Sequence, residues 1–492
     1  MSGAELIAIA LVLPVATAVL VALFGRRPNS REGATLLGAV ALFATVLALL
    51  TQVLGGAAPA LPLIEIVPGL TIAFAIEPLG MLFAVIASGL WIVNSLYSIG
   101  YMRANGEQRQ TVFYVCFALA IAATMGIAFS GNLFTLFLFY EVLTLVTYPL
   151  VTHSRTAEAK AAGRLYLLLL LGASTLLLLP AVAWTGIAAG TLDFANGGIL
   201  AGKLAPAAMG LLLALFIFGI AKAAVMPMHF WLPAAMVAPT PVSALLHAVA
   251  VVKAGVFFIV KVVVFVFGID TLRETGAGDW LVYVAGFTVI TASLVALRQD
   301  HLKRRLAYST ISQLSYVVLG ASLFTPLAIV GAVMHIAAHA VSKITLFFAA
   351  GSLHTAAHID HVSEMDGIGY RMPWTMGAFA VGALSMIGVP LTAGFLGKWF
   401  MLVGAGGHAQ WFAVGVIVLS TMLNAGYFLP VIYRAFRRPA KAEADGHGHD
   451  EAHSGEAPWP MVVALVTTAI LTVGLFFFPG VPLTLAQMLT AG

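Results

Sequence analysis

Six ionisable side chains lie within stretches of sequence that are otherwise apolar enough to cross a membrane. They are Glu141, Lys222, Lys253, Lys261, Lys343 and Lys398. One charged side chain at the centre of a spanning helix costs about 2.5–3.5 kcal/mol on insertion scales. Six would cost on the order of 15 kcal/mol, which is comparable with the stability of a whole domain. We therefore interpret most of them as groups that carry protons or bind cations. For Lys261, near the end of its stretch, extension of the ammonium group to the interface is an equally good interpretation.

Glu141 is the one acidic residue deep within such a stretch, in FLFYEVLTLVTYPLV. A carboxylate alone in lipid would take up a proton, whereas a lysine from another helix would hold it ionised, and Lys222 is the best candidate. Such a contact could be a static ion pair that orients two helices. It could equally open and close, so that the lysine accepts and releases a proton. Both interpretations use the same contact, and both stay open at this stage.

Helix-breaking residues surround two of the lysines. Four prolines follow Lys222 in KAAVMPMHFWLPAAMVAPTP, and proline and glycine interrupt GVPLTAGFLGKWF around Lys398. Proline cannot continue a regular helix. A broken spanning helix is tolerated only where its freed backbone groups line a cavity or are buried in protein. Two such helices, far apart in the chain, predict an inverted repeat with one site in each half.

Two histidines and a lysine in HIAAHAVSK are spaced i, i+4 and i+8. His335, His339 and Lys343 should therefore share one helix face, roughly 6 Å apart. A single buried histidine is usually a satisfied core residue, but a stripe of titratable groups is what proton hopping through water requires. His247 and Lys253 lie on one helix, six residues apart, and do not share a face unless the helix is distorted between them.

The composition excludes a water-soluble protein. Hydrophobic residues make up 61% of the 492 residues and charged residues only 9%, with a mean hydropathy of +1.02, whereas soluble proteins are about 25% charged. A net charge of +4 argues against nucleic-acid binding. Cys116 is the one cysteine, so no intrachain disulfide or thiolate cluster can form. We find no phosphate-binding glycine loop and no covalent nucleophile, and so expect neither a bound cofactor nor a catalytic site of the chain's own.

Counting apolar runs of about 20 residues predicts an all-α polytopic membrane protein with fourteen spans. Seventeen of the 24 lysines and arginines fall in the loops on one side, and only Lys203 and Arg273 fall on the other. Because basic loops stay in the cytoplasm, both termini should lie outside, in the periplasm if the membrane is a bacterial inner membrane. The N-terminus lacks the basic region of a signal peptide, so we interpret its apolar run as a retained first span.

The spans group into five regions. Residues 1–110 form a three-helix region with an outer hairpin or cap at 55–77. Residues 111–268 and 279–436 are the two predicted repeats of five helices, and 459–492 hold the last span. Between them, 437–458 is a linker rich in histidine and acid. His447, His449 and His453 could bind a metal ion weakly there, but a disordered linker is the favoured interpretation.

The motifs quoted above, together with LKRRLAYSTISQLSY, resemble the antiporter-like subunits shared by respiratory complex I, membrane-bound hydrogenases and Mrp-type cation/proton antiporters. The resemblance covers about residues 111–430. It implies a fourteen-helix bundle with two inverted five-helix repeats. It also implies that Glu141 pairs with Lys222, and that Lys253 and the histidines connect onward to Lys398. The site set that we expect is a proton relay: Glu141, Lys222, His247, Lys253, His335, His339, Lys343 and Lys398.

Two segments of the sequence are most similar to the MrpD-type members of this family: MDGIGYRMPWTMGAFAVGALSMIGVP and NAGYFLPVIYRAF. A third segment, PTPVSALLHAVAVVKAG, resembles larger members of the family. The leading hypothesis is a proton-translocating component of a multisubunit Na⁺ or K⁺/H⁺ antiporter, working with other membrane subunits in the bilayer. One alternative is the same machine driven by redox chemistry, in complex I or a hydrogenase-like or formate-oxidising complex. Others are the membrane component of a bicarbonate-uptake complex and a solute transporter that works alone.

Overall fold

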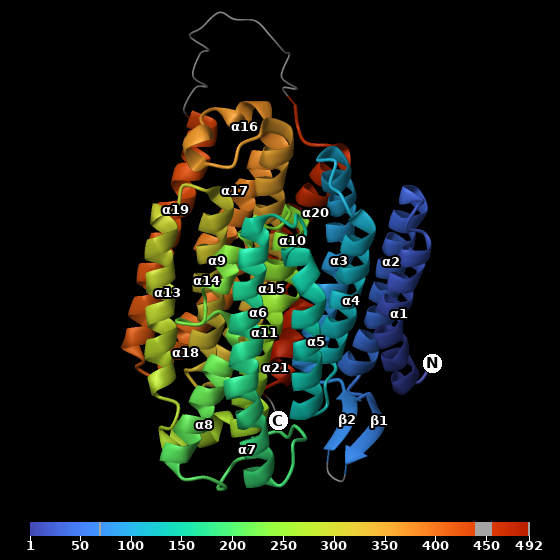
Figure 1. Ribbon diagram of the computed structural model, residues 1–492. Coiled ribbons are helices and arrows are strands. Elements are labelled where there is room, and N and C mark those ends of the chain that lie inside the picture. Colours follow the sequence, from blue (N-terminus) through green and yellow to red (C-terminus); the bar gives the residue numbers. More distant parts are fainter. Residues whose placement is uncertain (68–69, 438–454, 491–492) are drawn as a thin grey trace, which may run out of the picture.

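Long helices stand side by side along one axis in the computed structural model, which describes residues 1–67, 70–437 and 455–490 (Figure 1). Eleven helical stretches in this part of the chain are long and apolar enough to cross a membrane. The other three predicted spans fall on α8 and α17, which are shorter apolar helices, and on α14, which has 20 residues but many polar ones. The all-α polytopic fold predicted from composition is confirmed.

The elements follow one another without large insertions. Their bounds are α1 (Gly3–Leu23), α2 (Pro28–Leu54), β1 (Ala60–Val67), β2 (Leu70–Ala75), α3 (Pro78–Ala104), α4 (Gln110–Ala128), α5 (Leu133–Val151), α6 (Ala157–Ala173), η1 (Ser174–Leu178), α7 (Leu179–Ala189), α8 (Pro206–Gly219), η2 (Ala221–Ala223), α9 (Trp231–Ala234), η3 (Ala235–Val237), α10 (Thr240–Ala244), η4 (Leu245–Val249), α11 (Val251–Lys261), η5 (Val262–Phe267), α12 (Ile269–Thr275), α13 (Trp280–Arg298), α14 (Leu302–Ala321), α15 (Pro326–Ala357), η6 (Val362–Glu364), α16 (Ile368–Arg371), α17 (Pro373–Ile387), α18 (Ala393–Gly407), α19 (Trp411–Arg437), α20 (Trp459–Phe477) and α21 (Gly480–Met488).

The two ends of the bundle differ. At one end, which we call the hairpin end, β1 and β2 pair antiparallel within the segment where a hairpin or cap was predicted, and both chain termini lie toward the same end (Figure 1). The opposite end, the basic end, carries the loops rich in arginine and lysine. The linker histidines His447, His449 and His453 lie outside the described residues, and the boundaries of the two repeats stay a prediction.

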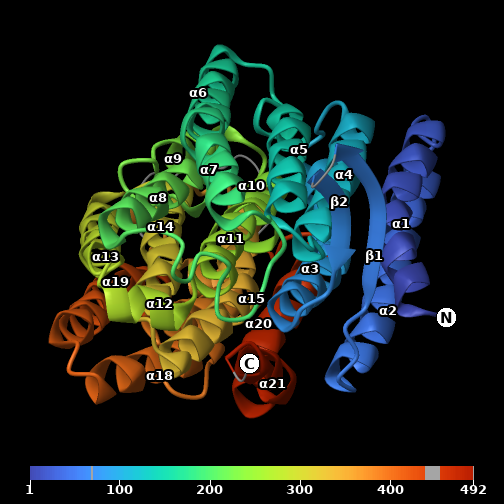
Figure 2. The ribbon, with the colours of Figure 1, turned by 90° about the horizontal axis from the view of Figure 1, so that it is seen from below.

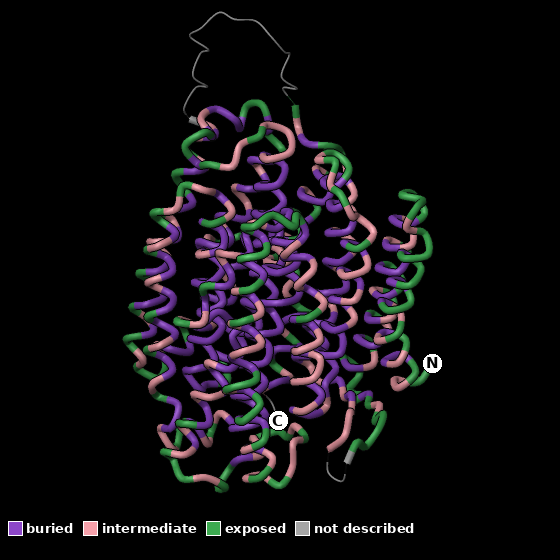
Figure 3. The backbone as a smooth tube through the Cα atoms, viewed as in Figure 1, coloured by how far each residue is buried: buried purple, intermediate pink, exposed green. Residues whose placement is uncertain are grey.

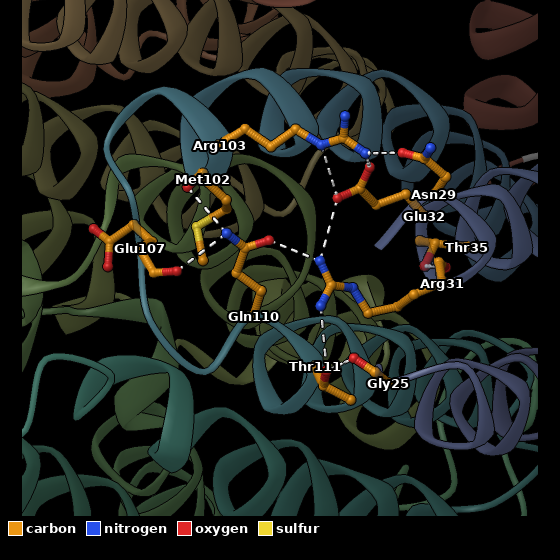
Figure 4. Close-up of polar contacts among 10 residues, drawn as sticks. All are labelled: Gly25, Asn29, Arg31, Glu32, Thr35, Met102, Arg103, Glu107, Gln110 and Thr111. Carbon is orange, nitrogen blue, oxygen red and sulfur yellow. Dashed lines mark hydrogen bonds and ion pairs between the residues drawn. The ribbon is translucent and has the colours of Figure 1, made fainter. Parts of the chain in front are cut away.

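The α1–α2 pair lies at the edge of the bundle, outside α3 and α4 (Figure 2). A polar cluster at the basic end ties it there (Figure 4). The buried Glu32 carboxylate accepts from Arg103 of α3 and pairs with Arg31 at 3.2 Å. Arg31 in turn donates to Gln110 at 2.7 Å and to Thr111 at 3.2 Å, both on α4. Because these groups satisfy one another, charged side chains can be buried at this helix junction.

The centre of the bundle is built largely from buried residues (Figure 3). In the continuous stretch from Thr240 to Phe267, formed by α10, η4, α11 and η5, the most apolar window is wholly buried. Most of α15 is also buried. These two stretches carry five of the predicted relay residues, so those side chains face protein and not lipid tails.

Two helices are broken where proline and glycine predicted it. The α8 helix ends at Gly219, and Lys222 follows in the short 3₁₀ turn η2. The predicted span at 373–403 is two helices: α17 ends at Ile387, Gly388 has a positive φ of 93°, and α18 begins at Ala393 with Lys398 in its second turn. Each break leaves backbone carbonyls free to accept hydrogen bonds inside the bundle.

Candidate functional site

Lys222 is fully buried and is held by α5. Its ammonium donates to the carbonyl oxygen of Tyr140 at 2.7 Å and to the hydroxyl of Thr144 at 2.6 Å, and it lies over the Tyr140 ring. Glycine at position 255 permits this arrangement, because a Cβ there would stand 2.2 Å from the backbone nitrogen of Ala223. The break after α8 is therefore pressed against α11, and Lys222 points from it toward α5.

The expected direct contact between Glu141 and Lys222 is not among the ion pairs of the described residues. Glu141 is half-buried next to Ser174 of η1, and its Oε1 atom has no hydrogen-bond partner in this part of the structure. The Lys222 ammonium instead donates to neutral acceptors on Tyr140 and Thr144, which lie on either side of Glu141 in the sequence of α5. The arrangement matches an ion pair that is open.

Lys253 joins the two central helices. Its ammonium nitrogen lies 2.6 Å from Nδ1 of His339 on α15, and both side chains are fully buried. A lysine and an imidazole at hydrogen-bond distance can share and pass a proton, because each group takes up or releases one at its nitrogen. The family resemblance implied a link between Lys253 and the histidines, and the structure brings Lys253 to His339.

The next contacts run from α15 to the second break. The rings of His339 and His335 are 6.4 Å apart, and Nε2 of His335 lies 2.9 Å from Oε1 of Gln313 on α14. The Gln313 amide donates to the carbonyl of Met386 at 3.2 Å, and the Lys398 ammonium donates to the same carbonyl at 2.8 Å. Lys253, the two histidines, Gln313 and Lys398 thus form a row of contacts across α11, α15, α14 and α18, which we call the central row.

Gln313 was not among the residues singled out from the sequence. Replacing it with leucine should interrupt the central row between His335 and Lys398 and lower proton transport on the order of tenfold, since one lost hydrogen-bonded step is about 1.4 kcal/mol of barrier. Thr310→Val is the matched control one turn away, because its hydroxyl bonds only to Leu306 of its own helix. Proton flux in vesicles measures both variants. Equal flux in Gln313→Leu and Thr310→Val would remove Gln313 from the row.

Lys343 and His247 lie beside the central row. The Lys343 ammonium donates to Ser309 of α14 at 2.8 Å, and Ser309 also accepts from the hydroxyl of Tyr427. The stripe of two histidines and Lys343 on α15 therefore splits toward different neighbours. His247 is fully buried with both ring nitrogens unpartnered among the described residues. The helix is distorted between His247 and Lys253, by the π-helical turn η4 and at Ala250. A distortion of this kind is what the two side chains would need in order to share one face.

Lys261 has its partners at the hairpin end of the bundle. Its side chain is 1% exposed, pairs with Glu77 at 2.7 Å and donates to the carbonyl of Ser130 at 2.8 Å. Glu77 is the N-cap residue of α3, directly after the β-hairpin. The Lys261 ammonium therefore extends toward the hairpin end, as one of its two interpretations expected, and there it meets a carboxylate that comes nearly two hundred residues earlier in the chain.

Comparisons with known proteins identify the family of the chain. The family model described as NADH:quinone oxidoreductase/Mrp antiporter matches residues 130–424, which hold every residue of the predicted relay. NADH-quinone oxidoreductase subunit N of Desulforudis audaxviator is 33% identical over 82% of this chain and 82% of its own length. The A/B component of a probable K⁺/H⁺ antiporter of Rhizobium meliloti is 33% identical over 67% of this chain, which spans only 32% of that relative.

Among solved structures, a chain of the Mrp complex from Dietzia sp. has the same fold, with a TM-score of 0.83 over 99% of this chain and 97% of that one. At 22% sequence identity, this likeness concerns the fold alone. The family model and the relative matched over most of its length carry the assignment. The chain belongs to the NADH:quinone oxidoreductase/Mrp antiporter family.

Proposed function

We propose that the chain is a proton-translocating membrane component of a multisubunit cation/proton antiporter of the Mrp type, exchanging protons for Na⁺ or K⁺. The observation that carries the proposal is the central row. Hydrogen bonds join Lys253 to His339 and lead from His335 through Gln313 and the Met386 carbonyl to Lys398, and the two histidine rings lie 6.4 Å apart between these two parts. Because buried ionisable groups are costly, a buried row that contains two lysines and two histidines indicates use in transport. In this proposal protons enter the central row by way of Glu141 and Lys222 and leave it from Lys398.

The basic end is then the cytoplasmic side, and both termini face the outside of a bacterial inner membrane. The excess of lysine and arginine in the loops at that end supports this orientation. A pocket of about 690 Å³ opens at the same end against Pro233–Val237, the broken stretch that follows Lys222. Its polar lining includes Glu158, His301 and Arg304. Such a pocket could admit water toward Lys222 from the cytoplasm.

A second candidate function is the same proton-translocating role in a redox-driven complex. The NADH-quinone oxidoreductase relative of Desulforudis audaxviator favours it, because the match covers the same large share of both chains. The two candidates differ in what drives the protons: a gradient of Na⁺ or K⁺ in the first, and electron transfer by partner chains in the second.

The test is transport by the assembled complex in everted membrane vesicles. Glu141→Gln and Lys222→Met should each lower cation-driven proton movement on the order of 100-fold, the range typical for loss of a positioned proton-transfer group. Glu274→Gln, an exposed glutamate at the hairpin end, is the control and should leave flux unchanged. Unchanged flux in a normally assembled Glu141→Gln complex would refute the relay. Flux that follows an electron donor and ignores Na⁺ and K⁺ would select the redox-driven candidate.

A further inference from the structure

Several buried polar atoms outside the central row have no hydrogen-bond partner in the described protein. They lie on α3, α10 and η4: the indole Nε1 of Trp91, Oδ1 of Asn94, the hydroxyl of Ser243, and both ring nitrogens of His247. All four side chains are completely inaccessible. Leaving one such atom unpaired costs about 1–3 kcal/mol, and native structures leave very few of them unsatisfied. Four such side chains together call for a common explanation.

The α3 helix packs antiparallel to the stretch from α10 to α11, and we infer that these side chains share the seam between them. The Phe83 and Phe257 rings meet at 5.2 Å at one level. At another level the amide of Asn94 donates to the carbonyl of Pro241 at 3.4 Å. Trp91 lies between these levels on α3, and His247 lies between them on the opposite stretch. The α15 helix closes the third side of the seam, since it packs against α3, α10 and η4.

The seam continues to the basic end through polar groups of α3 and α15. The Tyr97 hydroxyl donates to the carbonyl of Phe348 at 2.8 Å, and a Cβ on Gly351 would collide with that hydroxyl. One turn further, the Tyr101 ring stacks on His354 at 6.5 Å. His354 pairs with Asp360 at 3.0 Å, and these two side chains are 40% and 35% exposed. The line of polar groups therefore reaches solvent.

Water fits the inner part of the seam better than an ion does. The indole of Trp91 only donates, Oδ1 of Asn94 only accepts, and the hydroxyl of Ser243 and a neutral imidazole do both. A cation would be repelled by the indole N–H, and an anion by the amide oxygen. A buried water needs two to four polar partners of mixed kind. The His247 ring lies 4.6 Å from the ring of Phe347 on α15, one turn from Lys343 on the helix that also carries His339.

We propose that the seam between α3, α10 and α15 is a hydrated inlet, through which protons pass from His354 and Asp360 at the basic end to His247. The inlet rests on the proposed function, and it adds a route that enters the relay at its centre, apart from Glu141 and Lys222. The α3 helix, which lies outside both predicted repeats, thereby becomes part of the transport path and not only a support for it.

Hydroxyl-radical footprinting of the intact complex tests the water directly, because radicals made from bound water oxidise the side chains next to it. Trp91 and Trp231 are a matched pair: both are completely buried, but the Trp231 indole donates to the carbonyl of Ala221 at 3.0 Å. We expect Trp91 to be oxidised several-fold faster than Trp231. Equal protection of the two indoles would overturn the inlet.

Transport by variants tests conduction through the same seam. Ser243→Ala and Asn94→Leu should each slow proton uptake on the order of tenfold. Ser98→Ala is the control, because the Ser98 hydroxyl already donates to the carbonyl of Asn94 at 2.6 Å. Ser243→Ala removes a single oxygen atom and keeps the test valid if Asn94→Leu fails to assemble. Normal uptake in Ser243→Ala would overturn the inlet even if Trp91 is oxidised.

The two proposals fail in different ways. If Glu141→Gln abolishes proton flux while the Ser243 and Asn94 variants transport normally, the inlet is refuted and the relay is supported. If Glu141→Gln transports normally, the relay falls whatever the footprint of Trp91 shows.

Discussion

Replacing Lys253 with methionine is expected to stop proton transfer between the two halves of the chain. Lys253 reaches from α11 to His339 at 2.6 Å and is the one side chain of α11 that enters the central row. Methionine fills a similar volume but neither takes up nor releases a proton. Proton flux in everted vesicles should fall on the order of 100-fold, with normal amounts of the assembled complex in the membrane.

The Lys253→Arg variant tests whether Lys253 acts by transferring protons or only by its positive charge. Arginine keeps the positive charge but does not release its proton in proteins, so this variant should assemble and still fail to transport. If Lys253→Arg transports at the normal rate, Lys253 serves only as a fixed charge. Lys203→Met, at an exposed lysine of the hairpin end, is the control for loss of a lysine as such and should keep full flux.

Replacing Glu77 with leucine is expected to destabilise the chain severely. The substitution would leave the Lys261 ammonium buried without its carboxylate, with only the carbonyl of Ser130 as an acceptor. Breaking a buried ion pair by removing one partner costs about 3–5 kcal/mol, a large part of the stability of a domain. The thermal midpoint of the purified complex, or its yield from membranes, should fall accordingly.

A double replacement checks the cause of that loss. Glu77→Leu combined with Lys261→Leu removes both charges, so most of the lost stability should return. Asp270→Ala is the control, because its pair with Arg273 is 70% and 45% exposed, and exposed pairs contribute about 0–1 kcal/mol. A Glu77→Leu complex as stable as the unaltered one would mean that Lys261 finds another partner or is neutral when buried.

The sequence alone was sufficient to predict features for which the alternative would cost a large free energy. A lysine in an apolar stretch stands out because its burial is costly, so Lys222, Lys253, Lys343 and Lys398 could all be singled out. The breaks around Lys222 and Lys398 follow from proline and glycine, whose effect on a helix is local. The prediction of the fold, which the structure confirms, also depended on such strong signals, above all on long apolar stretches.

Other features depend on tertiary contacts that leave no pattern in the sequence. Gln313 is neutral, costs little to bury, and looks like any polar residue of α14, so nothing marks it as the link to Lys398. Glu77 lies at the end of the β-hairpin, and only the packing of α3 against α11 brings it to Lys261. The cost of a carboxylate alone in lipid and the family resemblance suggested that Glu141 and Lys222 are partners, but neither could predict that the lysine ammonium turns to Tyr140 and Thr144.

The direction of the central row has a consequence for energy conversion. The row crosses neighbouring helices from side to side, while the helices themselves stand along the bundle axis (Figure 1). A charge that moves the full way across a membrane at 100 mV exchanges about 2.3 kcal/mol with the electric field, but a charge that moves parallel to the membrane plane exchanges almost none. In the proposed relay, hops from Lys253 to Lys398 would thus be nearly silent electrically, and the voltage would act on the vertical steps by which protons enter and leave.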